Sequence, residues 1–211
     1  MSILRVVALG FPASRDQQLI QIVDAALADA TRRSKGWLVC RKGCTPCCMG
    51  VFAISQLDAA RLQRGLLELA QRDPERADAV RQRAREAVAR LSPDFPGDPA
   101  TGLLGKTKAQ RKRFESFAND EPCPALDLDE GTCDLYEVRP ITCRTFGPPV
   151  RVEGGGLGVC ELCYQGLSEK EVAACEMIPD PDDMESRLTK QVEKSTGKRG
   201  DTIVAFALAG P

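Results

Sequence analysis

The stretch Cys40-Arg41-Lys42-Gly43-Cys44-Thr45-Pro46-Cys47-Cys48 places four thiols within nine residues. Packing alone does not require this density, because a free cysteine packs as a small apolar side chain and is usually kept for its chemistry. The later part of the chain adds five more candidates: Cys123, Cys133, Cys143, Cys160 and Cys163. We therefore expect the early stretch and the later thiols to close on a shared inorganic centre.

Composition and cellular compartment decide how these thiols are interpreted. The 211-residue chain has a net charge of −1, which gives no general attraction to nucleic acid or to an anionic membrane. No apolar run approaches the roughly 20 residues of a membrane span, and the N-terminal stretch, interrupted by Arg5, lacks the pattern of a signal peptide. We expect a cytoplasmic protein, in which clustered cysteines favour metal binding or redox chemistry over disulfides.

The absence of histidine from the chain narrows the chemistry further. It excludes zinc sites that need imidazole, Cys–His dyads and Ser-His-Asp triads. Any metal must then be held mainly through sulfur. Zinc accepts four thiolates, and iron–sulfur clusters are also held by four cysteines, so the donor set leaves zinc and iron open.

Hydrophobic periodicity predicts an α+β protein that is mainly α. Together with the cysteines, it indicates several helices around a loop-rich, cysteine-ligated metal centre. The expected helices cover residues 16–33, 55–71, 73–91, 106–117, 135–138, 168–175 and 182–195. Ser55, with an acid three residues later, and Pro74 are typical of helix starts. We expect a loop at 92–105, a hairpin that pairs 150–152 with 157–159, and a tail at 202–208 that is a strand or a core segment.

We expect a single domain over residues 1–211 with three parts. A helical part covers about 1–118, a cysteine-rich part about 119–178, and a C-terminal helix and tail 179–211. The proline- and glycine-rich loop at 92–105 is the expected junction between the first two parts.

The spacing of the thiols indicates a metal site more strongly than buried structural cysteines. Adjacent residues such as Cys47 and Cys48 can hardly point the same way, so they serve two sites or one of them is not a ligand. Cys160 and Cys163 form a CxxC pair, which we interpret as the closing pair of a metal site because no βαβ unit surrounds it. The nine candidates exceed two four-coordinate sites by one, and a single site would leave five unexplained. Cys175 is expected to be a core residue.

Two arginines follow the second group of cysteines. Arg139 and Arg144 are placed to offset the negative charge of several thiolates through their N–H donors. The alternative is that they form ordinary ion pairs with Glu137 or Asp134. Both interpretations fit the sequence.

The order of the motifs resembles a known family. Cys40-x3-Cys44-x2-Cys47-Cys48, then Cys123-Pro-x-Leu, Cys133-x-Leu-Tyr-x-x-Arg-Pro-x-x-Cys143-Arg and Cys160 resemble the YkgJ-type cysteine-cluster family, which is described as chelating zinc or iron. This resemblance implies that the leading ligands are Cys40, Cys44, Cys47, Cys48, Cys133, Cys143 and Cys160. The same pattern is similar to part of flagellin lysine-N-methylase, so an iron–sulfur enzyme that modifies protein side chains is the alternative.

Partners are less well indicated. The basic segment 106–113 is typical of a solvated helix face, and acidic residues between 120 and 137 nearly cancel its charge, which argues against nucleic acid. A protein partner is left open, and we expect no membrane partner.

Overall fold

The computed structural model describes residues 11–152 and 154–210, and these separate into two compact units. Unit 1 contains Phe11, Gly43–Pro140 and the described part of Thr189–Pro211, whereas unit 2 contains Pro12–Lys42 and the described part of Ile141–Leu188. Helices dominate, and the named strands of the described residues form three two-residue pairs, which confirms the α+β, mainly α fold. No described helix is long and apolar enough to cross a membrane. The N-terminal stretch judged not to be a signal peptide, including Arg5, lies mostly outside the described residues.

Two long helices of unit 1 start where their caps predict. Helix α3 (Gln56–Arg72) has Ser55 as N-cap, whose Oγ accepts the Asp58 N–H at 3.2 Å. Helix α4 (Pro74–Leu91) begins with proline at its first position, and the Asp73 carboxylate accepts the Arg76 N–H at 3.0 Å. Both caps occupy N–H groups that have no partner within the helix.

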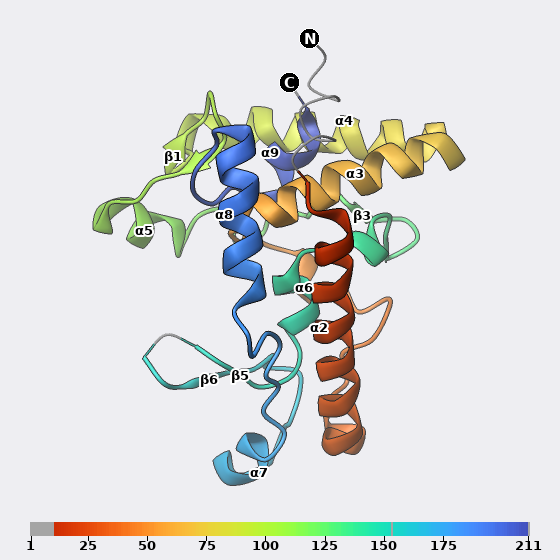
Figure 1. Ribbon diagram of the computed structural model, residues 1–211, viewed down its shortest axis with the longest axis vertical. Coiled ribbons are helices and arrows are strands. Elements are labelled where there is room, and N and C mark those ends of the chain that lie inside the picture. Colours follow the sequence, from red (N-terminus) through yellow and green to blue (C-terminus); the bar gives the residue numbers. More distant parts are fainter. Residues whose placement is uncertain (1–10, 153, 211) are drawn as a thin grey trace. The chain divides into compact units, whose positions relative to one another are not determined.

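Helices α3, α4 and α9 (Val204–Ala209) pack against one another and form the main core of unit 1 (Figure 1). Leu62 and Leu66 of α3 and Val80 and Ala84 of α4 are buried there, together with Leu208 of α9. The tail predicted as a strand or core segment is therefore a core helix. Its alanine-rich sequence favours a helix, and the preceding Thr202 forms an isolated bridge with Ile54.

The remaining elements of unit 1 are short. They are η2 (Pro46–Cys48), η3 (Ser92–Asp94), β1 (Gly97–Asp98), β2 (Leu103–Leu104), α5 (Lys108–Phe114), β3 (Leu126–Asp127), β4 (Thr132–Cys133) and η4 (Tyr136–Val138). Strands β1 and β2 form a hairpin inside the segment predicted as a plain loop. Helix α5 is shorter than predicted, and Thr107 begins it with a capping box to Gln110.

Unit 2 is organised around α2 (Ala13–Ser34), which confirms the first predicted helix and is followed by η1 (Lys35–Trp37). Helix α6 (Ile141–Thr145) packs on α2 and was not predicted, since its five residues directly follow Pro140. The predicted hairpin is present as β5 (Val150–Arg151) and β6 (Leu157–Gly158). Helix α7 (Glu169–Ala173) follows, and α8 (Met184–Thr196) begins in unit 2 and ends in unit 1.

Candidate metal centre

The ten cysteines are all free thiols, and each unit holds five of them. Unit 1 contains Cys44, Cys47, Cys48, Cys123 and Cys133, and unit 2 contains Cys40, Cys143, Cys160, Cys163 and Cys175. The boundary between the units falls inside the early stretch, after Lys42. Early and late thiols therefore occur together in both units.

Backbone hydrogen bonds join the early and late cysteine segments of unit 1. The Cys123 N–H donates to the Cys48 carbonyl at 2.8 Å, and the Gly50 N–H donates to the Glu121 carbonyl at 2.8 Å. Gly50 has a φ of +98°, and a Cβ there would lie 2.8 Å from the Asn119 carbonyl oxygen. A glycine is therefore required for the segment after Cys48 to approach this closely.

A second set of backbone bonds brings Cys133 to the same place. Strands β3 and β4 pair Leu126 with Cys133, and the Leu126 N–H donates to the Cys123 carbonyl at 2.9 Å. The Asp134 N–H donates to the Ala125 carbonyl at 2.8 Å. Cys48, Cys123 and Cys133 thus lie on three segments that are hydrogen-bonded in series.

The side chains of this group interact directly. The thiols of Cys47 and Cys48 are hydrogen-bonded, which, with burial, raises the pKa of Cys47. Burial raises the pKa of Cys123 to about 12 and also raises the pKa of Cys133, and Cys47 acts electrostatically on both. Cys47 and Cys48 are the last two residues of the 3₁₀ turn Pro46–Cys48, and whether both are ligands stays a prediction.

Arg139 is the cation that faces this group. Its positive charge lowers the pKa of Cys47 and of Cys133. The neighbouring Cys48 and burial raise the pKa of Cys47 by more, and burial raises that of Cys133 by more. Its guanidinium carbon lies 3.9 Å from the centroid of the Tyr136 ring, and its Nη1 donates to the Tyr136 carbonyl at 2.9 Å. This position fits the first interpretation of the two arginines, in which Arg139 offsets thiolate charge, and that interpretation stays a prediction. Arg144 instead pairs with Asp24 inside unit 2.

Of the other interpretation, the pairing of Asp134 with Arg139 or Arg144 is wrong, whereas a pair with Glu137 stays a prediction. The Asp134 side chain is fully buried, and both of its oxygens bind arginines of α4, Arg76 and Arg83. Arg83 also donates to the Pro124 carbonyl at 2.9 Å, so it connects the residues next to Cys123 and Cys133. The sequence analysis missed both arginines. Their seven-residue spacing, which places them on one face of a helix, was the available signal.

Unit 2 brings three of its thiols together. The Cys163 sulfur accepts backbone N–H bonds from Val39 and Cys40 and is hydrogen-bonded to the Cys160 thiol. The Cys163 N–H donates to the Cys160 carbonyl at 2.9 Å, which closes a tight turn between them. Cys40 and Cys160 pack against a small core that contains Cys163, Tyr164 and Cys175. The CxxC pair thus meets the first cysteine of the early stretch.

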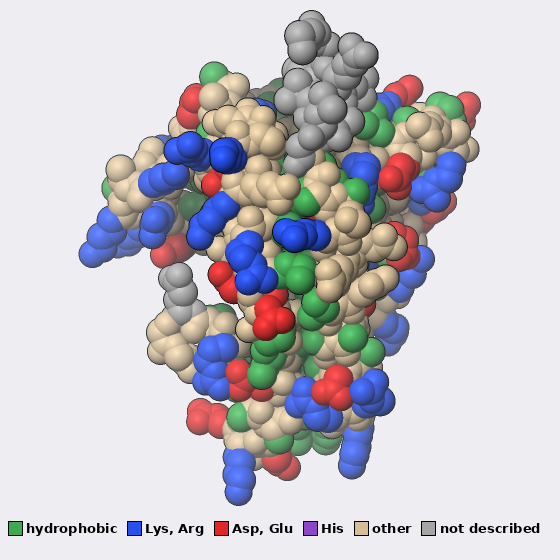
Figure 2. Space-filling view, viewed as in Figure 1, with side chains coloured by type: hydrophobic (Ala, Val, Ile, Leu, Met, Phe, Trp, Pro, Cys, Tyr) green, Lys and Arg blue, Asp and Glu red, His purple; other side chains and the backbone are tan. Residues whose placement is uncertain are grey.

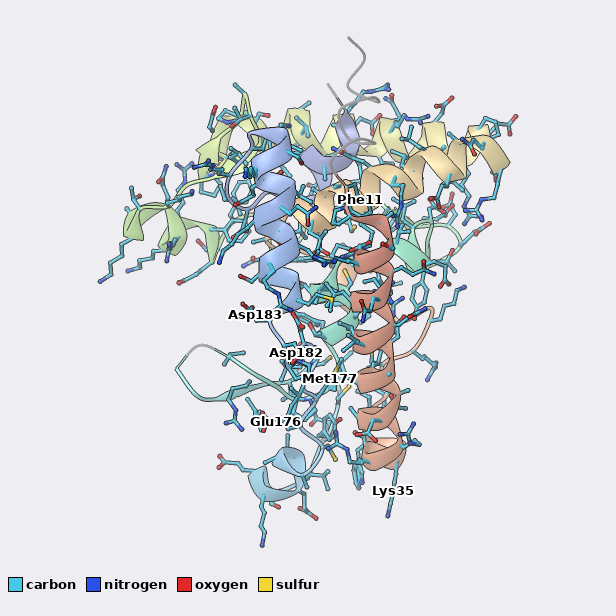
Figure 3. All side chains as sticks on the ribbon, viewed as in Figure 1. Phe11, Lys35, Glu176, Met177, Asp182 and Asp183 are labelled. Atoms are coloured by element: carbon cyan, nitrogen blue, oxygen red, sulfur yellow. The ribbon has the colours of Figure 1, made fainter. Side chains whose placement is uncertain are left out.

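The remaining cysteines occupy other positions. Cys44 is half-buried just after the boundary of unit 1, and Cys143 is half-buried on α6. Cys175 is buried, as the prediction of a core residue requires, but it belongs to the same small core as Cys163. The adjacent Glu176 and Met177 (Figure 3) fix this segment: Met177 donates to the Pro149 carbonyl at 2.8 Å, and Glu176 pairs with Arg151.

The donor set of unit 1 fits a thiophilic metal. Cys47, Cys48, Cys123 and Cys133 are sulfur donors on paired backbone segments, with Arg139 next to them. Across residues 11–152 and 154–210, no three Cys, Asp or Glu side chains are already arranged to hold a metal ion. Binding therefore requires rotation about the single χ1 angle of the cysteines, which moves a sulfur without moving the backbone.

Two other surfaces lie away from the thiols. Lys and Arg side chains gather over α5 (Figure 2), where Arg113 pairs with Asp94, in agreement with a solvated helix face. A cavity of about 210 Å³ in unit 1 is bordered by α3, α8 and α9, and its described lining includes Gln56, Gln63 and Phe206 but no cysteine. Neither surface shares residues with the thiol groups.

The comparisons with known proteins identify one family. The model of the family described as "CxxCxxCC: Putative zinc- or iron-chelating domain" matches residues 39–156. This range contains all five thiols of unit 1 together with Cys40 and Cys143, but ends before Cys160 and Cys163. No curated protein and no solved structure matches the chain.

Proposed function

Because the chain belongs to this family of zinc- or iron-chelating domains, we propose that it binds zinc or iron through cysteine thiolates in the cytoplasm. The proposed ligands in unit 1 are Cys47, Cys48, Cys123 and Cys133. A bound ion would supply the positive charge that lets several neighbouring thiols exist as thiolates. Arg139 would balance the excess negative charge of four thiolates through its N–H groups.

One observation carries this proposal: Cys48, Cys123 and Cys133 come from segments far apart in the sequence that backbone hydrogen bonds join. The backbone bond from Cys123 to Cys48 and the β3–β4 pair bring these segments together without a metal. Buried structural thiols alone would not need an arginine beside them. The combination of clustered sulfur donors and a cation is typical of a centre that carries negative charge.

The test is metal analysis of the full chain purified without air. We expect bound zinc or iron in the wild type, and loss of metal from this site in Cys133→Ser. Cys175→Ser is the matched control, because Cys175 lies in the other unit, and this variant should keep the metal of unit 1. Retention of the same metal content by Cys47→Ser, Cys123→Ser and Cys133→Ser would contradict the ligand assignment.

The same samples separate zinc from an iron–sulfur cluster. Zinc without acid-labile sulfide and without colour indicates a mononuclear thiolate site, whereas iron with sulfide and visible absorption indicates a cluster. The alternative of an enzyme that modifies protein side chains has no support in the comparisons. Cys44 and Cys143 remain proposed ligands from the family resemblance, and their serine variants belong in the same series.

A further inference from the structure

The thiols of unit 2 form a group with its own backbone support. Two N–H groups, from Val39 and Cys40, donate to the Cys163 sulfur, and the Cys160 thiol is hydrogen-bonded to it. These contacts place the CxxC pair beside the backbone of Val39 and Cys40.

A glycine makes room for the third member of this group. A Cβ on Gly147 would lie 2.7 Å from the Cβ of Cys40 and 3.1 Å from its sulfur. The Gly147 carbonyl also accepts the Cys160 N–H at 3.4 Å. The same glycine therefore admits the Cys40 side chain and holds the turn that carries Cys160 and Cys163.

The surroundings keep the CxxC turn in position. Tyr164 directly follows Cys163, has a φ of +58°, and donates its N–H to the Trp37 carbonyl at 2.9 Å. Its hydroxyl lies 2.5 Å from the Ser34 Oγ at the end of α2. A left-handed conformation is unfavourable for a residue with a large side chain, so these contacts hold a strained backbone next to the thiols.

Sulfur is the shared chemistry of this group. No histidine exists in the chain, and the three thiols pack against the apolar side chains of a small core. Sulfur donors select zinc or another thiophilic ion over magnesium or calcium, which prefer oxygen. Three thiolates leave one position of a tetrahedral ion for a further ligand.

From this arrangement we propose that Cys40, Cys160 and Cys163 form a second metal site, contained within unit 2. The inference rests on the proposed function and extends it, because it divides the family's cysteine stretch between two sites: Cys40 serves unit 2, and Cys47 and Cys48 serve unit 1. Two of its three ligands lie beyond the residues that match the family.

The experiment uses the full chain, reduced and freed of metal under anaerobic conditions, with Zn²⁺ as the only probe. Bound zinc is measured per chain after removal of free ion. We expect two equivalents in the wild type and one in Gly147→Ala, which removes no thiol but pushes into Cys40. Gly156→Ala is the matched control, because a Cβ there would approach nothing closer than 3.8 Å, and it should keep two equivalents. Circular dichroism checks that the variants are folded.

Cysteine variants complete the test. Cys163→Ser and Cys133→Ser should each lose one equivalent, and the double variant should lose both. One equivalent in the wild type that Cys133→Ser abolishes would overturn the second site and leave the proposed function intact. Equal zinc in Gly147→Ala and Gly156→Ala would also overturn it. No zinc in any sample would overturn the second site together with zinc binding by unit 1, and would leave only iron for the proposed function.

Discussion

Gly65, on the buried face of α3, provides a sharp test of the packing that supports the thiols of unit 1. A Cβ at this position would lie 2.3 Å from Cγ2 of Val138 and 3.0 Å from its Cβ and Cγ1. Val138 ends the η4 turn between Cys133 and Arg139. Gly65→Ala must therefore displace the turn that connects a proposed ligand to its neighbouring cation.

The expected magnitude is the balance of two opposing effects. Overpacking a well-filled contact costs about 1–3 kcal/mol, and the stiff χ1 of a β-branched valine limits its escape. Replacing glycine by alanine within a helix contributes about 1 kcal/mol in the other direction. We therefore expect Gly65→Ala to lower the free energy of unfolding by up to about 2 kcal/mol.

Val138→Ala supplies the matched background, since it removes both methyl groups, including the one at 2.3 Å, and leaves only the Cβ of residue 138 at 3.0 Å from the new Cβ. In that background, Gly65→Ala should be neutral or stabilising by up to about 1 kcal/mol. The two substitutions should then show a coupling energy of about 1–3 kcal/mol, as expected for residues in direct contact.

Chemical denaturation of the reduced, metal-free chain measures this cycle. Far-UV circular dichroism follows the helices, and fluorescence of Trp37, the single tryptophan, follows unit 2 separately. The Trp37 transition should not change between the four proteins. If Gly65→Ala changes the free energy of unfolding equally with valine and with alanine at position 138, the contact between residues 65 and 138 does not limit the packing of α3. That result would contradict the prediction.

Three further predictions concern other contacts and the metal itself. Asp134→Asn should lower the free energy of unfolding by about 1–3 kcal/mol, because Arg76 and Arg83 lose a buried carboxylate but still reach water; unchanged denaturation would contradict this. Ser168→Ala should raise the pKa of Glu171 toward 4.5, because the hydrogen bond from the serine hydroxyl lowers it. An NMR titration of the Glu171 carboxyl measures this change. The raised pKa means that Glu171 stabilises the folded state less at pH values above 4.5. A strong chelator should lower the Tm of the metal-loaded chain and leave that of the metal-free chain unchanged.

Long helices could be predicted from the sequence because local signals agree with packing. The cap at Ser55 and the proline at position 74 mark helix starts in both the sequence and the structure. The β1–β2 hairpin and α9 could not be predicted in the same way. The hairpin has two-residue strands, and the apolar tail has no periodicity to separate a strand from a buried helix.

The thiols themselves were recognisable, but their grouping was not. Spacing along the chain suggests that Cys40 and Cys47 act together, whereas the structure places them in different units. Between them, Gly43 has a φ of +87°, a conformation that suits glycine and redirects the chain. The partners of each thiol are set by hydrogen bonds to segments distant in the sequence, such as the bond from Cys123 to Cys48, which no local pattern encodes.

This grouping has an energetic consequence for metal binding in unit 1. The segment between Cys48 and Cys123 contains α3, α4 and α5, and an unfolded loop of that length would have to be closed by the metal alone. The packed core and the Cys123–Cys48 backbone bond have already closed it. A metal ion therefore has to order only side chains, and its binding free energy is available to favour thiolates over the protonated thiols that burial otherwise favours. Loss of the α3–α4 core should consequently weaken metal binding even when every cysteine is intact.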